Sequence, residues 1–171
     1  MKRDEAAAGA RPGSVQAEIQ QSVPFGSRSE EAGVALMRTS SMLGRALARV
    51  VEPEGISVAQ YNVLRILRGA GQGGMPTLMI RDRMIEEGAS ITRLLDKLEH
   101  AGFVRRERCR PDRRQVIGYL TDEGRAVLDR LDPAVHAAGE KAMRVLSEDE
   151  LTTLVSLLDT IRCGLRSDTG D

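Results

Sequence analysis

The spacing of apolar residues changes after Gly102, and this change restricts the fold more than any other feature of the chain. Before it, residues 88–100 repeat their apolar side chains at the three- and four-residue steps of an amphipathic helix. After it, residues 103–109 and 115–120 are short runs that favour β-structure, joined by the turn-forming segment Arg110-Pro111-Asp112-Arg113. The sequence therefore predicts a helix that leads directly into a β-hairpin.

Further helices are expected on both sides of this pair. Ser57 and Gln60 have the spacing of a capping box, and Ser147 with Glu150 repeats it near the C-terminus. Thr121, followed by two acidic residues, marks another helix start. The expected helices cover residues 30–51, 57–68, 76–84, 88–100 and 147–165. One more helix is expected to begin at residue 121 and to continue beyond Val135. The chain is therefore expected to be mainly α with one small β-hairpin.

Composition excludes several classes of protein. Hydrophobic residues make up 41% of the chain and aromatic residues 2%, so the core must be built mostly from aliphatic side chains. There is no apolar run long enough for a membrane span and no secretory signal, which predicts a cytoplasmic protein without a membrane partner. The two cysteines, Cys109 and Cys163, are expected to be free thiols. Motifs for a catalytic site, a metal or another cofactor are not found, so we expect no enzyme and no cofactor.

Basic charge is concentrated in the hairpin, although the formal net charge of the chain is +0. Residues 104–114 contain six Arg against Glu107 and Asp112, a local charge of +4, whereas residues 115–171 have a net charge of −5. Local positive charge is what attracts phosphate groups and releases their counterions. The hairpin is therefore a candidate nucleic-acid contact.

The helix before the hairpin has the features of a DNA-reading helix. Its polar side begins with the small residue Ser90 and continues with Arg93 and Lys97. Small residues at a helix N-terminus allow close approach to base edges in the major groove. A reading helix followed by a cationic hairpin is the arrangement of a winged helix-turn-helix domain, which binds double-stranded DNA.

The end of the hairpin resembles a known family signature. Asp112, Arg114, and then Leu120 with Thr121 after five residues, match the D-x-R-x5-L-T pattern of the MarR family, and the resemblance extends over about residues 30–165. It implies that Asp112 shapes the wing and that Arg114 enters the minor groove. The DNA-contacting residues expected from the helix, the wing and this resemblance are Ser90, Thr92, Arg93, Lys97, Arg110, Asp112, Arg113 and Arg114.

The apolar stripes of the outer helices are too wide for the small central domain to cover, which predicts a homodimer. We expect a flexible tail at 1–27, an N-terminal dimerisation helix at 28–56, a winged helix-turn-helix domain at 57–121 and C-terminal dimerisation helices at 122–171. A dimer would bind a pseudo-palindromic operator, as a repressor. The resemblance also implies a small aromatic or anionic effector near the junction of these parts, for which the candidate residues are Arg38, Met42, Tyr61 and Arg65.

The sequence departs from the family pattern at two points, and it is compatible with two other functions. Glu86 and Glu87 stand where the family has an uncharged turn, and the helix before them retains only the apolar spacing. The first alternative is a winged-helix module that binds protein and not DNA. The second is a redox-sensing regulator, because Cys109 lies among arginines that could lower the pKa of its thiol.

Overall fold

The protein divides into two compact units, residues 1–48 and residues 49–171. The computed structural model describes residues 13–86, 88, 90–109 and 115–168. The division between the units falls inside helix α2 (Arg28–Val51). Across the described ranges, every helix is too short or too polar to span a lipid bilayer.

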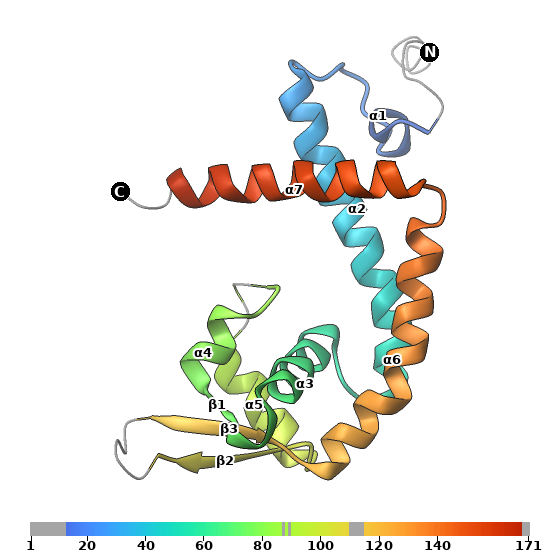
Figure 1. The fold of residues 1–171 in the computed structure, drawn as a ribbon. Helices are drawn as coiled ribbons and strands as arrows, with labels where there is room; N and C mark the ends of the chain where they lie inside the picture. Colours follow the sequence, from blue (N-terminus) through green and yellow to red (C-terminus); the bar gives the residue numbers. More distant parts are fainter. Residues whose placement is uncertain (1–12, 87, 89, 110–114, 169–171) are drawn as a thin grey trace. The chain divides into compact units, whose positions relative to one another are not determined.

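A small three-stranded sheet and three helices form the centre of the unit 49–171 (Figure 1). The helices are α3 (Val58–Ala70), α4 (Thr77–Asp82) and α5 (Ile91–His100). The strands are β1 (Met75–Pro76), β2 (Val104–Arg108) and β3 (Val116–Leu120), all antiparallel in the order β1-β3-β2. The predicted hairpin is confirmed as β2 and β3, and α3 packs against both α5 and β3. This is the architecture of a helix-turn-helix domain with a wing.

Side-chain caps set the predicted helix starts. The Ser57 hydroxyl accepts from the backbone N–H of Gln60 at 3.2 Å, and the Gln60 side chain accepts from the backbone N–H of Ser57 at 2.9 Å. The Thr121 hydroxyl accepts from Gly124 N–H at 3.1 Å and donates to the Gly102 carbonyl at 2.7 Å. Gly102 has a φ of 77°, which explains a glycine where the chain leaves α5. The capping boxes expected from the sequence are confirmed.

The core is aliphatic, as the composition requires. It contains residues from α3, α4, α5, β2 and the helix that follows the wing, α6 (Asp122–Met143). Its largest fully buried side chains are those of Leu64, Leu67, Ile80, Leu95, Leu98 and Leu128. Since Leu95 and Leu98 of α5 are buried in the core, the rotation of this helix about its axis is fixed. The burial of one side therefore determines which residues the other sides of the helix present.

Helix α6 begins very close to the start of β2. A Cβ atom on Gly124 would lie 2.2 Å from the carbonyl oxygen of Phe103, a distance that side chains do not reach. The same carbonyl accepts from Thr121 N–H at 3.2 Å. The missing side chain at Gly124 therefore permits the backbone contact between wing and helix.

The last two helices are long. Pro133 lies inside α6 without ending it, and α7 (Glu148–Asp168) follows. The predicted capping box at the start of α7 is present, with the Ser147 N–H donating to Glu150 at 2.8 Å. Several large apolar side chains of α7 are exposed in the single chain, namely Val155, Leu157, Ile161 and Leu165.

The unit 1–48 contains one short element that the sequence analysis did not predict. Helix α1 (Val15–Glu18) is capped by Ser14, whose hydroxyl accepts from Ala17 N–H at 3.4 Å. Glu18 pairs with Arg38 of α2 at 2.7 Å. The segment expected to be a flexible tail through residue 27 therefore contains a short helix at these residues, and its flexibility stays a prediction.

Other differences concern boundaries. The helix expected from residue 88 begins at Ile91, and the helix expected to reach residue 84 ends at Asp82. Strand β1 was missed because its two residues have no readable pattern and are defined by their pairing with Ile117 and Gly118 of β3. Two short 3-10 helices, Glu52–Glu54 and Gly71–Gly73, lie in segments read as helix ends.

Candidate nucleic-acid interface

Helix α5 has one side in the core and the opposite side in solvent. Ile91, Leu95 and Leu98 are buried in the core. At about 100° per residue from Ile91, Arg93 and Lys97 lie at about 200° and 240°, on the opposite side, and both are exposed. The expectation that the basic side of this helix is open to solvent is confirmed.

The N-terminus of α5 is built from small polar residues that are also exposed. Ser90 occupies the N-cap position with φ −67° and ψ 96°, but its side chain makes no capping hydrogen bond. Thr92 is exposed in the first turn. The hydroxyl of Ser90 is therefore not used to hold its own helix, and the helix end presents little bulk, as close approach to base edges requires.

The two strands of the wing separate their arginines onto opposite faces, because side chains alternate along a strand. On the outer face, the Arg105 guanidinium lies 4.0 Å from the centre of the Tyr119 ring, and Arg105 also pairs with Glu107. Arg106 and Arg108 point to the other face, the one on which Gly118 contacts the core. The cations of β2 therefore have different surroundings although they are close in sequence.

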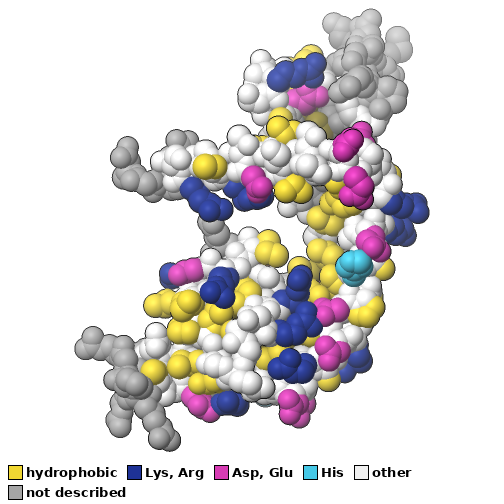
Figure 2. Space-filling model, in the orientation of Figure 1, with side chains coloured by type: hydrophobic (Ala, Val, Ile, Leu, Met, Phe, Trp, Pro, Cys, Tyr) yellow, Lys and Arg dark blue, Asp and Glu magenta, His cyan; other side chains and the backbone are white. Residues whose placement is uncertain are grey.

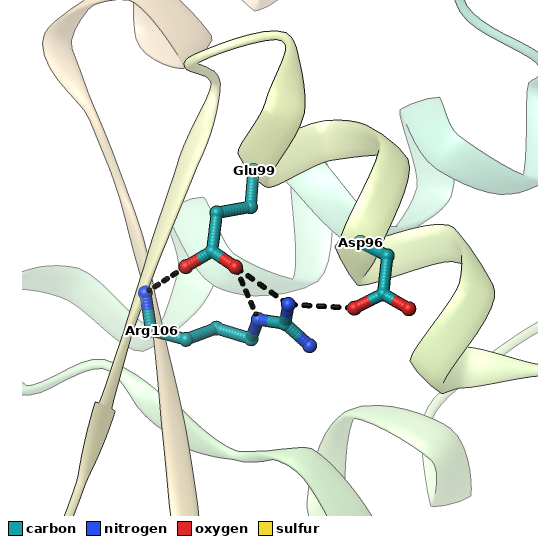
Figure 3. Close-up of polar contacts among 3 residues, drawn as sticks. All are labelled: Asp96, Glu99 and Arg106. Atoms are coloured by element: carbon teal, nitrogen blue, oxygen red, sulfur yellow. Dashed lines mark hydrogen bonds and ion pairs between the residues drawn. The ribbon is translucent and has the colours of Figure 1, made fainter.

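Arg106 is held by two acidic side chains of α5 (Figure 3). Its Nε donates to Glu99 Oε2 at 2.9 Å and its Nη2 donates to the same oxygen at 2.5 Å. Nη2 also donates to Asp96 Oδ1 at 2.6 Å. The hydrogen bonds that Arg106 donates to Glu99 and Asp96 raise its pKa, although partial burial opposes them. Arg106 is thus engaged within the protein.

Three basic side chains near this cluster are exposed and have no ion-pair partner among the described residues. These are Arg93, Lys97 and Arg108. The first two lie on the outward side of α5, and Arg108 lies on β2 two residues beyond Arg106. Arg108 was not among the predicted contacts, although strand alternation after Arg106 could have placed it on the same face.

The wing tip falls outside the described residues. Arg110, Asp112, Arg113 and Arg114 belong to it, so their predicted roles remain predictions. The described part of the hairpin closes with a hydrogen bond from Cys109 N–H to the Gln115 carbonyl at 2.9 Å. Cys109 is half-buried and both cysteines are free thiols.

A pocket of about 450 Å³ lies between α3 and α6. Of the predicted effector residues, Tyr61 and Arg65 line it, whereas Arg38 and Met42 belong to the unit 1–48. Basic side chains gather over α3 with acidic side chains beside them in the space-filling view (Figure 2). The remaining lining residues, which the sequence did not predict, are Arg68, Asp132, Pro133, Val135 and His136.

A hydrogen-bonded group joins the two helices beside this pocket. The Tyr61 hydroxyl donates to Asp132 Oδ1 at 2.8 Å, and Arg68 donates to Asp132 Oδ2 at 2.5 Å. Burial, and then the hydrogen bond to Asp132, raise the pKa of Tyr61 to about 12. Burial alone would raise the pKa of Asp132, but the hydrogen bonds from Arg68 and Tyr61 lower it below the ordinary value.

Comparison with known proteins points to the same architecture. The model of the MarR family matches residues 56–116. The chain is 32% identical over 136 residues to the HTH-type transcriptional regulator TtmR of Methylorubrum extorquens, covering 80% of this chain and 68% of that protein. It is 35% identical over 129 residues to the HTH-type transcriptional regulator PecS of Dickeya dadantii, covering 74% and 76%.

A solved structure shows this fold on DNA. Sco3205, a MarR family transcriptional regulator from Streptomyces coelicolor crystallised in complex with DNA, superposes with a TM-score of 0.72 at 26% identity, covering 84% of this chain and 92% of that one. The similarity therefore extends over most of both chains.

Proposed function

We propose, from the premise that this chain belongs to the MarR family of DNA-binding transcriptional regulators, that it is a homodimeric repressor that binds a pseudo-palindromic operator. Family membership also makes it a regulator and not an enzyme. In the proposed complex, α5 enters the major groove and the wing reaches the adjacent minor groove or its backbone.

The observation that carries this proposal is the set of exposed, unpaired cations on α5 and β2. Arg93, Lys97 and Arg108 have no acidic partner in the described part of the chain, and they lie on elements that meet at the Arg106 cluster. Cations without partners are free to replace the counterions of DNA phosphates. The exposed small side chains of Ser90 and Thr92 provide the close approach that base reading requires.

Dimer formation is supported by the exposed apolar side of α7. Leu157, Ile161 and Leu165 follow one another at four-residue steps along α7, and each is about half exposed or more in the single chain. A contiguous apolar stripe on one helix is costly in water and is characteristic of an oligomer interface. A second copy of the chain would place two α5 helices on half-sites about 34 Å apart, which is one turn of DNA.

An effector is proposed for the pocket between α3 and α6. Arg65 is exposed there and makes no close ion pair with an acidic side chain of the described residues, although its charge acts on Asp132, while Pro133 and Val135 supply an apolar wall. This combination suits a small aromatic carboxylate. A shift in thermal stability with a panel of aromatic carboxylates, lost in Arg65→Gln, is the expected result, and no shift with any of them would remove this part of the proposal.

Binding to duplex DNA as a function of salt tests the main proposal. The wild-type protein should enrich a specific duplex from a random-sequence pool and bind it with an affinity that falls steeply as KCl is raised. A winged-helix module that binds only protein would enrich no duplex and would show weak binding with little salt dependence.

The redox alternative has its own outcome. Oxidation of Cys109 would abolish DNA binding after peroxide treatment, and Cys109→Ser would prevent that loss. Binding that is unchanged by peroxide leaves the ligand-responsive repressor as the proposed function.

A further inference from the structure

We propose that Arg106 is a positioning residue that locks the wing to the recognition helix, so that α5 and β2 meet DNA as one rigid unit. The inference rests on the proposed DNA-binding function and concerns how that site is held in shape. It assigns a structural task to an arginine that, from its place in a cationic wing, would otherwise be counted as a phosphate ligand.

The geometry joins the strand to the helix through both main chain and side chain (Figure 3). Glu99 Oε1 accepts from the backbone N–H of Arg106 at 3.0 Å, while Glu99 Oε2 accepts from the guanidinium. Asp96 Oδ1 accepts a further hydrogen bond from Nη2 of the guanidinium at 2.6 Å. Asp96 and Glu99 are three residues apart and therefore lie on one side of the helix. One arginine thus binds two positions of α5, about one turn apart, to one strand.

The side of α5 that bears Asp96 and Glu99 is distinct from the core side and from the outward side. At 100° per residue from Ile91, Glu99, Thr92 and Asp96 fall at about 80°, 100° and 140°. Arg93 and Lys97 fall further round, on the outward side. The clamp therefore holds the helix by the side that faces the wing and leaves the outward cations free.

Toward the outer end of the wing, apolar packing does not hold the strands against α5. A hollow of about 430 Å³ lies there, between α4, α5 and the strands. Its lining includes Thr92 of α5, Val116 of β3 and Arg106 itself. Since side chains leave this space open, the ion cluster is the link that sets the angle between helix and wing on this side.

Charge argues against a role for Arg106 as a phosphate ligand. The cluster of Asp96, Glu99 and Arg106 has two acidic groups and one basic group, so its formal charge is negative. A phosphate would have to displace a carboxylate that makes two guanidinium hydrogen bonds, and only 22% of the Arg106 side chain is exposed. Arginine is also the side chain whose planar fork suits such bidentate pairing, which lysine cannot reproduce.

The position of the clamp explains why it would matter for reading DNA. Asp96 is adjacent to Lys97 in α5, and Arg108 lies two residues beyond Arg106 on the same face of β2. A loosened clamp would change the spacing between the cations of the helix and those of the wing. Binding sites tolerate errors of only about 0.5 Å in such placements. Specific binding should therefore suffer more than general attraction to DNA.

The test compares Glu99→Gln and Arg106→Lys with the wild type and with Arg105→Gln, a control on the opposite face of the same strand. Glu99→Gln retains an oxygen that can accept from the Arg106 backbone, and Arg105 lies on the outer face of the same strand. Fluorescence anisotropy is measured on the duplex enriched by the wild type and on a scrambled duplex, over a range of KCl. Circular dichroism and thermal melting verify folding.

For a positioning role, Glu99→Gln and Arg106→Lys should each weaken binding to the enriched duplex by at least about threefold. Their affinity for the scrambled duplex and their salt dependence should stay within about twofold of wild type, and Arg105→Gln should leave the preference for the enriched duplex intact. A phosphate ligand predicts the reverse: Arg106→Lys retains binding, and Glu99→Gln strengthens binding to both duplexes.

Failure of the proposed function and failure of the clamp give different results. If the wild type enriches no duplex, the proposed function fails, whatever the variants do. If the wild type binds specifically while Glu99→Gln and Arg106→Lys bind like it, the clamp alone is overturned. Should Arg106→Lys fail to fold, Asp96→Asn and Glu99→Gln measured together provide the same comparison, since a clamp predicts a larger loss of specificity in the double variant than in Asp96→Asn alone.

Discussion

Arg105 and Arg106 are consecutive residues of β2, but their guanidinium groups lie on opposite faces of the sheet and have different partners. Arg105 stacks on the Tyr119 ring at 4.0 Å, whereas Arg106 is bound by two carboxylates of α5. The positive charge of the wing counted from the sequence is therefore larger than the charge available to DNA. Of the arginines in β2, the one that is exposed and lacks an acidic partner among the described residues is Arg108.

Arg108→Ala should weaken binding to every duplex by a similar factor, because a phosphate contact contains little sequence information. The slope of log affinity against log salt should fall by about 0.9, which corresponds to one phosphate contact. Anisotropy titrations at several KCl concentrations measure both. Arg105→Ala is the control, since it removes the same charge from the outer face. Equal effects of the two substitutions would contradict a specific role for Arg108.

Gly124→Ala should strongly destabilise the protein, by about 2 kcal/mol or more, because the added Cβ would lie 2.2 Å from the Phe103 carbonyl oxygen. Gly139→Ala in the same helix is the matched control, since a Cβ there meets nothing within 4 Å. It should stabilise the protein by about 0.5 to 1 kcal/mol. Urea unfolding at neutral pH measures both changes. Similar effects of the two alanines would show that the close approach of α6 to β2 is absent.

Tyr61→Phe should lower the free energy of unfolding by about 1 kcal/mol at neutral pH, through loss of the hydrogen bond to Asp132.

The pKa of Asp132 is lower in the folded protein than in the unfolded chain. Its stabilising contribution is therefore present above the unfolded pKa and is lost as the pH falls through the folded pKa. Urea unfolding of Asp132→Asn and wild type should show a difference in stability that shrinks in acid. A difference independent of pH would contradict this.

Ionisation of the Tyr61 phenol at alkaline pH gives a separate prediction. Since the folded pKa of Tyr61 is about 12, its phenol should stay protonated well above the ordinary tyrosine range. The stabilisation from the neutral phenol is fully present below the unfolded pKa and is lost as the pH rises through about 12. Tyrosinate absorbance of Tyr119→Phe, in which Tyr61 is the remaining tyrosine, follows this titration. Ionisation near the ordinary value would contradict both the burial of Tyr61 and its hydrogen bond to Asp132.

Ile161→Asp should weaken the proposed dimer, because it places a charge in the apolar stripe of α7. Light scattering coupled to gel filtration should give the mass of a dimer for wild type and a monomer for the variant at micromolar concentration. Ser156→Asp, on the polar side of α7, is the control and should remain dimeric. A monomeric wild type would refute the dimer, and a dimeric Ile161→Asp would place its interface elsewhere.

The local elements of this protein follow from its sequence, because helical spacing, capping boxes and turn residues act over a few neighbouring positions. Ser57 with Gln60, Thr121 and the buried side of α5 are examples. The winged arrangement could be predicted for the same reason, since the change of period at Gly102 is local. Strand β1 could not, because two residues become a strand only when β3 lies beside them.

The partners of charged residues were decided by tertiary structure. Nothing in the sequence around Arg106 distinguishes it from Arg108, and counting charge treats both as cations available to DNA. The fold brings Glu99 and Asp96 of α5 to one of them and leaves the other exposed. Ion pairs between distant segments depend on which helix side faces which strand. The sequence alone therefore determined the main helices, the hairpin and the place of the basic region, while the packing of α5 against β2 decided which arginine is free to meet DNA.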